Sequence, residues 1–160
     1  MPQWNVYHSE GVFKTAEEKK GFRTRSTYVN NYYHVYGKLP AFYVVVNFLP
    51  MPAGTMFRGY DDVADLDKPF VRLSISHMAA HRSDGMGAER FRRGIDGAIK
   101  TFIVEKGYYY EYSVVEEPRE MWKIDGIMPP PYGSETFMKW NKENKVSDYT
   151  EGNPEVQTNA

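Results

Sequence analysis

The chain has 160 residues, a formal net charge of -1 and no cysteine. This length suits one domain with a substantial core, and the balanced charge gives no electrostatic reason to bind nucleic acid or anionic lipid. The lack of cysteine excludes disulfides, thiol nucleophiles and cysteine metal sites, which fits a reducing compartment. No apolar run is long enough to span a bilayer, and the polar N-terminus lacks a signal-peptide core. We therefore expect a cytoplasmic protein with neither a membrane nor a nucleic-acid partner.

The most unusual local feature is a proline directly after Met1. A small residue at this position favours removal of the initiator methionine, which would expose a secondary amine at Pro2. A free α-amino group has a pKa of roughly 7.7 to 8.0, and burial lowers that pKa further. Pro2 is thus a candidate general base or nucleophile. The alternative interpretation is that Pro2 is only a rigid residue that precedes a strand. The strand is predicted because Trp4, Val6 and His8 alternate with more polar neighbours.

The rest of the first half predicts a helix followed by a strand. Thr15 and Glu18 have the spacing of a capping box, so a helix should begin there and run to about Tyr36, before Gly37. The run 40–50 is almost continuously β-branched and aromatic. Such a run is typical of a strand that is covered on both faces.

The second half repeats this order after a long connection. Residues 51–69 are rich in turn residues and acids, which predicts a loop with a short hairpin around 56–59. Strands are predicted at 70–77 and 108–116, where apolar and polar residues alternate over the first. Between them, residues 85–107 predict a helix whose apolar stripe is Ala88, Phe91, Ile95, Ala98 or Ile99, and Phe102.

Two β-α-β units, at about residues 2–50 and 69–117, predict an α+β fold with one four-stranded sheet and two helices on one face. We expect a single domain over residues 1–145 that includes a short helix from Ser134 to about Asn144. Residues 146–160 form a polar tail that we predict to be disordered. The uncovered face of the sheet favours self-association, most simply as a closed ring.

Several of these features resemble the tautomerase superfamily, and within it the oxalocrotonate tautomerase-like group around cis-3-chloroacrylic acid dehalogenase. They are Pro2 at the start of a strand, the doubled β-α-β pattern, and the runs Leu39–Phe48, Glu116–Gly126 and Pro129–Glu135. The resemblance covers roughly residues 2–145. It implies a homotrimer without a cofactor, in which the processed Pro2 amine lies at the floor of an apolar pocket. There the amine acts as a base in keto-enol tautomerisation, or as an acid in hydration of an unsaturated carboxylic acid.

The resemblance also implies residues that would bind a small carboxylate. The histidine expected late in the first helix falls at Tyr33 or His34, and both remain candidates. The expected clamp of two arginines falls just after the third strand, where Arg82 is the one arginine. His77 or His81 would replace the other arginine.

Other positions depart from the dehalogenase pattern. The tyrosine expected in the fourth strand falls nearest Ser113, with Tyr112 on the opposite face. The water-activating glutamate falls on Ile124, and we expect the neighbouring Asp125, with Trp122, to shape or polarise the far wall of the pocket. These losses keep open a second interpretation, a non-catalytic binding trimer with the same fold.

Three other interpretations have less support. His77 and His81 have the i, i+4 spacing of zinc ligands, but Met78 stands where the hydrolytic motif has glutamate, and we predict no metal. The tyrosine-rich run 108–112 lacks the interleaved basic residues of a single-strand nucleic-acid platform, and we expect it to form strand packing and a subunit interface. A ferredoxin-like dimer, in which Pro2 has no special role, would be distinguished by its oligomer mass.

Overall fold

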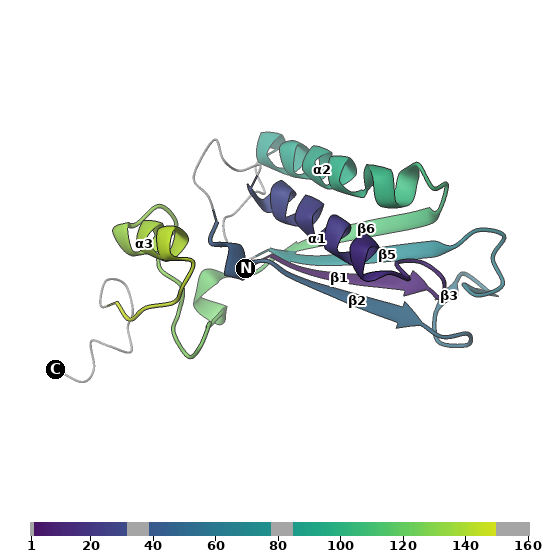
Figure 1. Cartoon of the computed structure of the whole chain (residues 1–160), viewed down its shortest axis with the longest axis horizontal. Helices are drawn as coiled ribbons and strands as arrows, with labels where there is room; N and C mark the ends of the chain where they lie inside the picture. Colours follow the sequence, from purple (N-terminus) through teal and green to yellow (C-terminus); the bar gives the residue numbers. More distant parts are fainter. Residues whose placement is uncertain (1, 32–38, 78–84, 150–160) are drawn as a thin grey trace.

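A four-stranded mixed sheet forms the centre of the computed structural model, which describes residues 2–31, 39–77 and 85–149 (Figure 1). The strands lie in the order β2-β1-β5-β6, with β1 parallel to β2 and antiparallel to β5, and β5 parallel to β6. Their bounds are β1 Pro2–Ser9, β2 Val45–Met51, β5 Phe70–His77 and β6 Tyr109–Glu116. The predicted α+β fold with two β-α-β units is confirmed.

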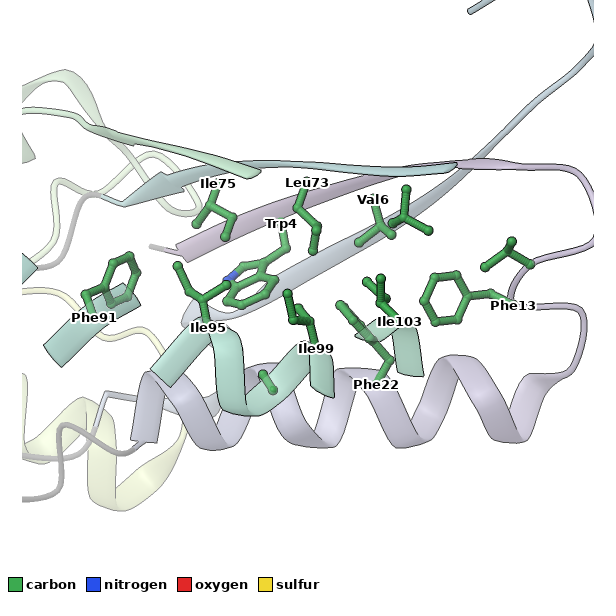
Figure 2. Packing of buried hydrophobic residues seen from close by; sticks show 13 residues of the cluster. Trp4, Val6, Phe13, Phe22, Leu73, Ile75, Phe91, Ile95, Ile99 and Ile103 are labelled. Carbon is green, nitrogen blue, oxygen red and sulfur yellow. The ribbon is translucent and has the colours of Figure 1, made fainter. Parts of the chain in front are cut away.

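Both long helices, α1 (Ala16–Asn31) and α2 (Gly85–Ile99), cover the same face of the sheet (Figure 1). Alternation along the strands turns every second side chain toward them, because successive strand residues point to opposite faces. The resulting core is mainly apolar, although His8 and His77 are also buried on this face. Figure 2 shows strand and helix side chains meeting between the two layers. The largest members of the core include Trp4, Phe22, Leu73, Ile75, Ile95, Ile99 and Ile103.

The predicted capping box starts α1. The backbone N–H of Glu18 donates to Thr15 Oγ1 at 3.1 Å, and the N–H of Thr15 donates to Glu18 Oε2 at 3.3 Å. Two of the otherwise unpaired N–H groups of the first turn are thereby satisfied. The helix is described to Asn31, while its predicted end at Tyr36 falls in residues 32–38, outside the described part of the chain.

The predicted stripe of the second helix packs on the core but lacks one buried residue, Ile103. After Ile99 the helix widens into the π-helical turn η3 (Lys100–Val104), in which the N–H of Glu105 donates to the carbonyl of Lys100. A π turn holds one more residue than an α turn, so the side chains beyond it are rotated. Ile103 is therefore fully buried in the core, and Phe102 is only half-buried.

The run 40–50 is not one strand covered on both faces. Ala41–Tyr43 forms the 3-10 helix η2, and β2 begins only at Val45. β2 is an edge strand that pairs with β1 alone, which explains why most of its side chains are half-buried. A run of apolar residues indicates that a segment is buried, but it does not predict where a strand lies within the sheet.

The far end of the sheet carries the predicted hairpin, formed by β3 (Phe57–Arg58) and β4 (Asp61–Asp62). The face of the sheet opposite the helices is polar over much of its area. Asn47 Nδ2 donates to Asn5 Oδ1 at 2.8 Å across β1 and β2, and Arg72 pairs with Glu111 across β5 and β6. Within the described residues, no helix is long and apolar enough to cross a membrane.

A second apolar cluster lies beyond the end of the sheet at which β1 begins (Figure 1). We call it the aromatic lobe, and its buried members are Leu39, Tyr43, Trp122, Phe137, Trp140 and Tyr149. The lobe contains the 3-10 helix η4 (Arg119–Met121) and the predicted short helix, α3 (Glu135–Glu143). Ser134 caps α3 by accepting from the N–H of Phe137.

The aromatic lobe includes four residues that sequence analysis assigned to the polar tail. The indole Nε1 of Trp140 donates to the Ser147 carbonyl at 3.0 Å, and the Tyr149 hydroxyl donates to the Met128 carbonyl at 2.7 Å. These bonds hold residues 146–149 against α3 and the segment before it. The tail prediction is therefore wrong for these four residues.

Candidate functional site

Pro2 is buried at the start of β1, on the face of the sheet that the helices cover. It begins the strand that lies between β2 and β5, and it pairs with His77 of β5. β5 and β6 both end where β1 begins, because they run antiparallel to it. The proline therefore lies at the edge of the sheet that faces the aromatic lobe.

His77 lies directly beside Pro2. The two residues are paired in the antiparallel register of β1 and β5, a geometry that places Cα atoms about 4.5 to 5.5 Å apart. The His77 side chain is buried, and its ring centroid is 5.0 Å from that of Phe91 on α2. Of the predicted substrate-binding residues, His77 is the one that the described structure brings next to Pro2.

Trp122 is buried in the aromatic lobe, where its ring contacts Tyr43 in an edge-to-face arrangement with centroids 5.0 Å apart. Tyr43 ends η2 and lies two residues before β2, whose Val45 is in register with Gln3. Burial raises the pKa of the Tyr43 hydroxyl above its usual range, so Tyr43 remains protonated near neutral pH. Together the two rings form an aromatic wall beyond the start of β1.

Asp125 lies exposed at the tip of a tight turn rather than in the lobe. Reciprocal backbone hydrogen bonds of 2.9 Å join Ile124 and Ile127, and both Asp125 and Gly126 have positive φ. This is the geometry of a type I′ turn, which Asp and Gly favour. The Asp125 carboxylate makes no hydrogen bond or ion pair with the described residues, while the side chain of Ile124 packs against the aromatic lobe.

The two faces of β6 separate the residues near the expected catalytic tyrosine. Tyr112 points toward the helices, and its hydroxyl donates to Asp96 Oδ1 on α2 at 3.0 Å. Burial and this bond raise the pKa of Tyr112 to about 12. Ser113 is exposed on the opposite face. Tyr112 therefore links β6 to α2. It lies four residues before Glu116, which is in register with His77, and His77 is in turn in register with Pro2.

Four other predicted site residues, Tyr33, His34, His81 and Arg82, lie outside the described residues. The predicted role of each stays a prediction. Among the residues that the structure describes, no group of three or more His, Asp or Glu side chains is arranged to hold a metal ion.

Sequence analysis did not single out two residues that the structure places at this end of the sheet. Tyr43 belongs to a run that predicted a strand, and Arg119 lies in the quoted segment 116–126 without a role of its own. The signal that identifies them is strand register. Tyr43 precedes β2, which lies on one side of β1, and Arg119 follows β6, which lies two strands away on the other side. That register is a property of the folded sheet.

A four-stranded sheet formed by two β-α-β units, with a proline beginning an inner strand, defines the class as the tautomerase fold. The chain matches a family described as "Putative oxalocrotonate tautomerase enzyme" over residues 1–145, and it belongs to that family. No functionally curated protein matches it.

Solved structures agree with this assignment. A protein described as a probable enzyme of the thermophilic fungus Aspergillus fumigatus is 37% identical, with a TM-score of 0.80 and coverage of 93% of this chain and 98% of that one. RhCC from Rhodococcus jostii RHA1 is 31% identical, with a TM-score of 0.81 and coverage of 92% and 99%. N1, a member of the cis-3-chloroacrylic acid dehalogenase family, shares the fold at 15% identity, with a TM-score of 0.64 and coverage of 89% and 97%.

Proposed function

We propose that this protein is a tautomerase-like enzyme in which Pro2, once Met1 is removed, acts as general base or acid on a small carboxylic acid. The substrate is enolisable or unsaturated. The observation that carries the proposal is the burial of Pro2 at the start of β1 beside His77, in a chain of the tautomerase family. Burial matters because it disfavours the charged amine and lowers its pKa toward the range in which a proton can be both accepted and returned.

Keto-enol isomerisation is the reaction that requires the fewest catalytic groups at this site. The Pro2 amine takes the proton from the enol hydroxyl and, as the ketone forms, delivers a proton to the carbon next to it, so the amine is regenerated and no co-reactant is consumed. A donor next to the developing charge on oxygen lowers the barrier. We assign this orienting role to His77 or His81, with Arg82 and Tyr33 or His34 holding the carboxylate, as the family resemblance implies. Trp122 shapes the far wall, and Asp125 is proposed to polarise it from the adjoining turn.

Substitution of Pro2 by Ala tests this proposal. The wild-type protein should accelerate the ketonisation of phenylenolpyruvate, followed by the loss of enol absorbance, and P2A should lose that acceleration. Asp96→Asn is a suitable control for nonspecific damage, because it alters the exposed hydrogen bond between Tyr112 and Asp96 without altering a proposed site residue. Unchanged turnover in P2A would remove Pro2 from the mechanism.

A non-catalytic binding protein is the second candidate, and one observation favours it. The position of the water-activating glutamate holds Ile124, whose side chain packs into the aromatic lobe. A hydration or dehalogenation step would thus lack its base. A panel of enolisable and unsaturated acids that shows no turnover above background, with the oligomer intact, would support binding over catalysis.

We further propose that the protein assembles as a homotrimer in the cytoplasm. The sheet supports self-association, because within residues 2–31, 39–77 and 85–149 no further strand pairs with β2 or β6 and the helices cover only one face. Mass measurement in solution tests this, with three chains expected and two chains contradicting it.

A further inference from the structure

Arg119 lies three residues after β6, the strand that ends level with Pro2. Glu116 is in register with His77, and His77 is in register with Pro2. The N–H of Glu117 donates to the His77 carbonyl at 3.0 Å, which continues the strand pairing by one bond. Arg119 comes two residues later and begins η4. It therefore leaves the sheet at the end where the Pro2 nitrogen lies.

The chain then crosses to the other side of β1. Trp122 caps η4, since its N–H donates to the Arg119 carbonyl at 3.2 Å, and its ring contacts Tyr43. Tyr43 precedes β2, which flanks β1 on the side away from β5. The segment 119–122 thus runs from the β6 side of the sheet to the β2 side, across the end at which β1 begins (Figure 1).

The guanidinium of Arg119 is held in a defined position. Nη1 donates to the Pro129 carbonyl at 2.8 Å. Burial raises the pKa of the Tyr149 hydroxyl, and the positive charge of Arg119 lowers it by less. That hydroxyl donates to the Met128 carbonyl, so its position is fixed as well. Because the guanidinium is already held in place, it loses less conformational entropy when it binds a carboxylate.

The positive charge of Arg119 has only a weak partner. Its side chain is 28% exposed, and the carboxylate within 4 Å of it in the described structure is that of Glu120, at 3.6 Å from Nη2. Glu120 is itself 66% exposed. By comparison, Lys106 and Glu18 approach to 2.8 Å. A largely buried guanidinium gains most from an anion that can accept two of its N–H groups at once.

We propose that Arg119 binds the carboxylate of the ligand on which Pro2 acts, which adds a cation that the two-arginine pattern after β5 lacks. The inference rests on the proposed function for its choice of ligand, a 2-oxo or unsaturated monocarboxylic acid. The guanidinium donates from the N–H groups not used by the Pro129 carbonyl. The reactive carbon then lies between Arg119 and the Pro2 nitrogen, with Tyr43 and Trp122 beside it.

Calorimetric titration with phenylpyruvate and with its methyl ester tests this assignment. The ester has the same skeleton but no negative charge, so the ratio of the two affinities measures carboxylate recognition. Wild type should prefer the acid by about tenfold or more, as expected for a charge-assisted hydrogen-bonded pair. Arg119→Gln should abolish most of that preference, and Arg119→Lys should keep part of it.

Lys139→Gln is the matched control, because it removes one positive charge from the exposed side of α3 in the same lobe. It should leave the preference unchanged. Arg119 also supports the Pro129 segment, so a purely structural role would weaken acid and ester binding equally. Equal weakening, or an unchanged preference in Arg119→Gln, would overturn the assignment. Binding at equilibrium needs no turnover, so P2A should keep the preference, and loss of activity in P2A is a separate result.

Discussion

Substituting Gly21 by Ala should destabilise the protein, although the same change stabilises most exposed helices. Ala is better than Gly in a helix interior by about 1 kcal/mol. At this site, however, the new Cβ would lie 3.0 Å from Cζ and 3.2 Å from Cε1 of Phe102. Ordinary carbon contacts are about 3.5 to 4.0 Å, so the ring must move by several tenths of an ångström.

The ring of Phe102 is not free to move without cost. It packs edge-to-face on Phe22 at 5.8 Å, and Phe22 packs in turn on Phe13 at 5.2 Å and Phe48 at 5.7 Å. Overpacking of this kind costs about 1 to 3 kcal/mol. Set against the helix gain, the expected net loss is about 1 kcal/mol, or a fall of about 2 to 4 °C in Tm for a chain of this length.

Urea unfolding at a fixed protein concentration measures this loss, as a lower midpoint with an unchanged slope. The decisive comparison is a double-mutant cycle with Phe102→Leu, which removes the ring atoms that the new Cβ at position 21 would contact. In that background Gly21→Ala should become neutral or stabilising, because the helix gain remains and the clash is removed. A stabilisation of about 1 kcal/mol by Gly21→Ala in the wild-type background would refute the reasoning.

Three further changes test the local structure. Thr15→Ala should cost about 1 kcal/mol of unfolding free energy through loss of the capping box. Ser9→Ala should cost about 1 to 3 kcal/mol, because Ser9 Oγ accepts the buried N–H of Phe70 at 2.9 Å; faster amide exchange at Phe70 would accompany it. Burial and Lys19 lower the pKa of His8 in the folded protein. The free energy of unfolding should therefore fall as the pH drops below about 6.5, because His8 then binds a proton more readily in the unfolded chain. His8→Phe should flatten that fall in Tm, whereas an equally steep fall would exclude His8 as its cause.

Local chemistry explains the parts of the fold that the sequence predicted correctly. The bond pair between Thr15 and Glu18 needs only residues three apart, and the alternation along 70–77 needs only one buried face. The same holds for the start of α3 at Ser134, whose hydroxyl accepts the N–H of Phe137. Each signal is complete within one turn or one strand.

The features that the sequence did not predict depend on contacts between distant segments. The π turn after Ile99 moves Ile103 into the core, and no residue type in that stretch specifies the extra residue of the turn. The position of β2 at the sheet edge depends on which strands pair. Likewise, Tyr43 and Arg119 are far apart in sequence, and only strand register and the crossing of η4 bring them to the Pro2 end.

The state of the Pro2 nitrogen is the central claim, and one matched variant tests it most directly. Insertion of an alanine between Met1 and Pro2 keeps the proline ring but makes its nitrogen a tertiary amide, which has no basic lone pair. Intact mass establishes the first residue of both proteins, and phenylenolpyruvate ketonisation is then measured on each. The wild type should begin at Pro2 and be active, while the extended chain should show only background turnover. Equal activity in the two proteins would contradict a catalytic Pro2.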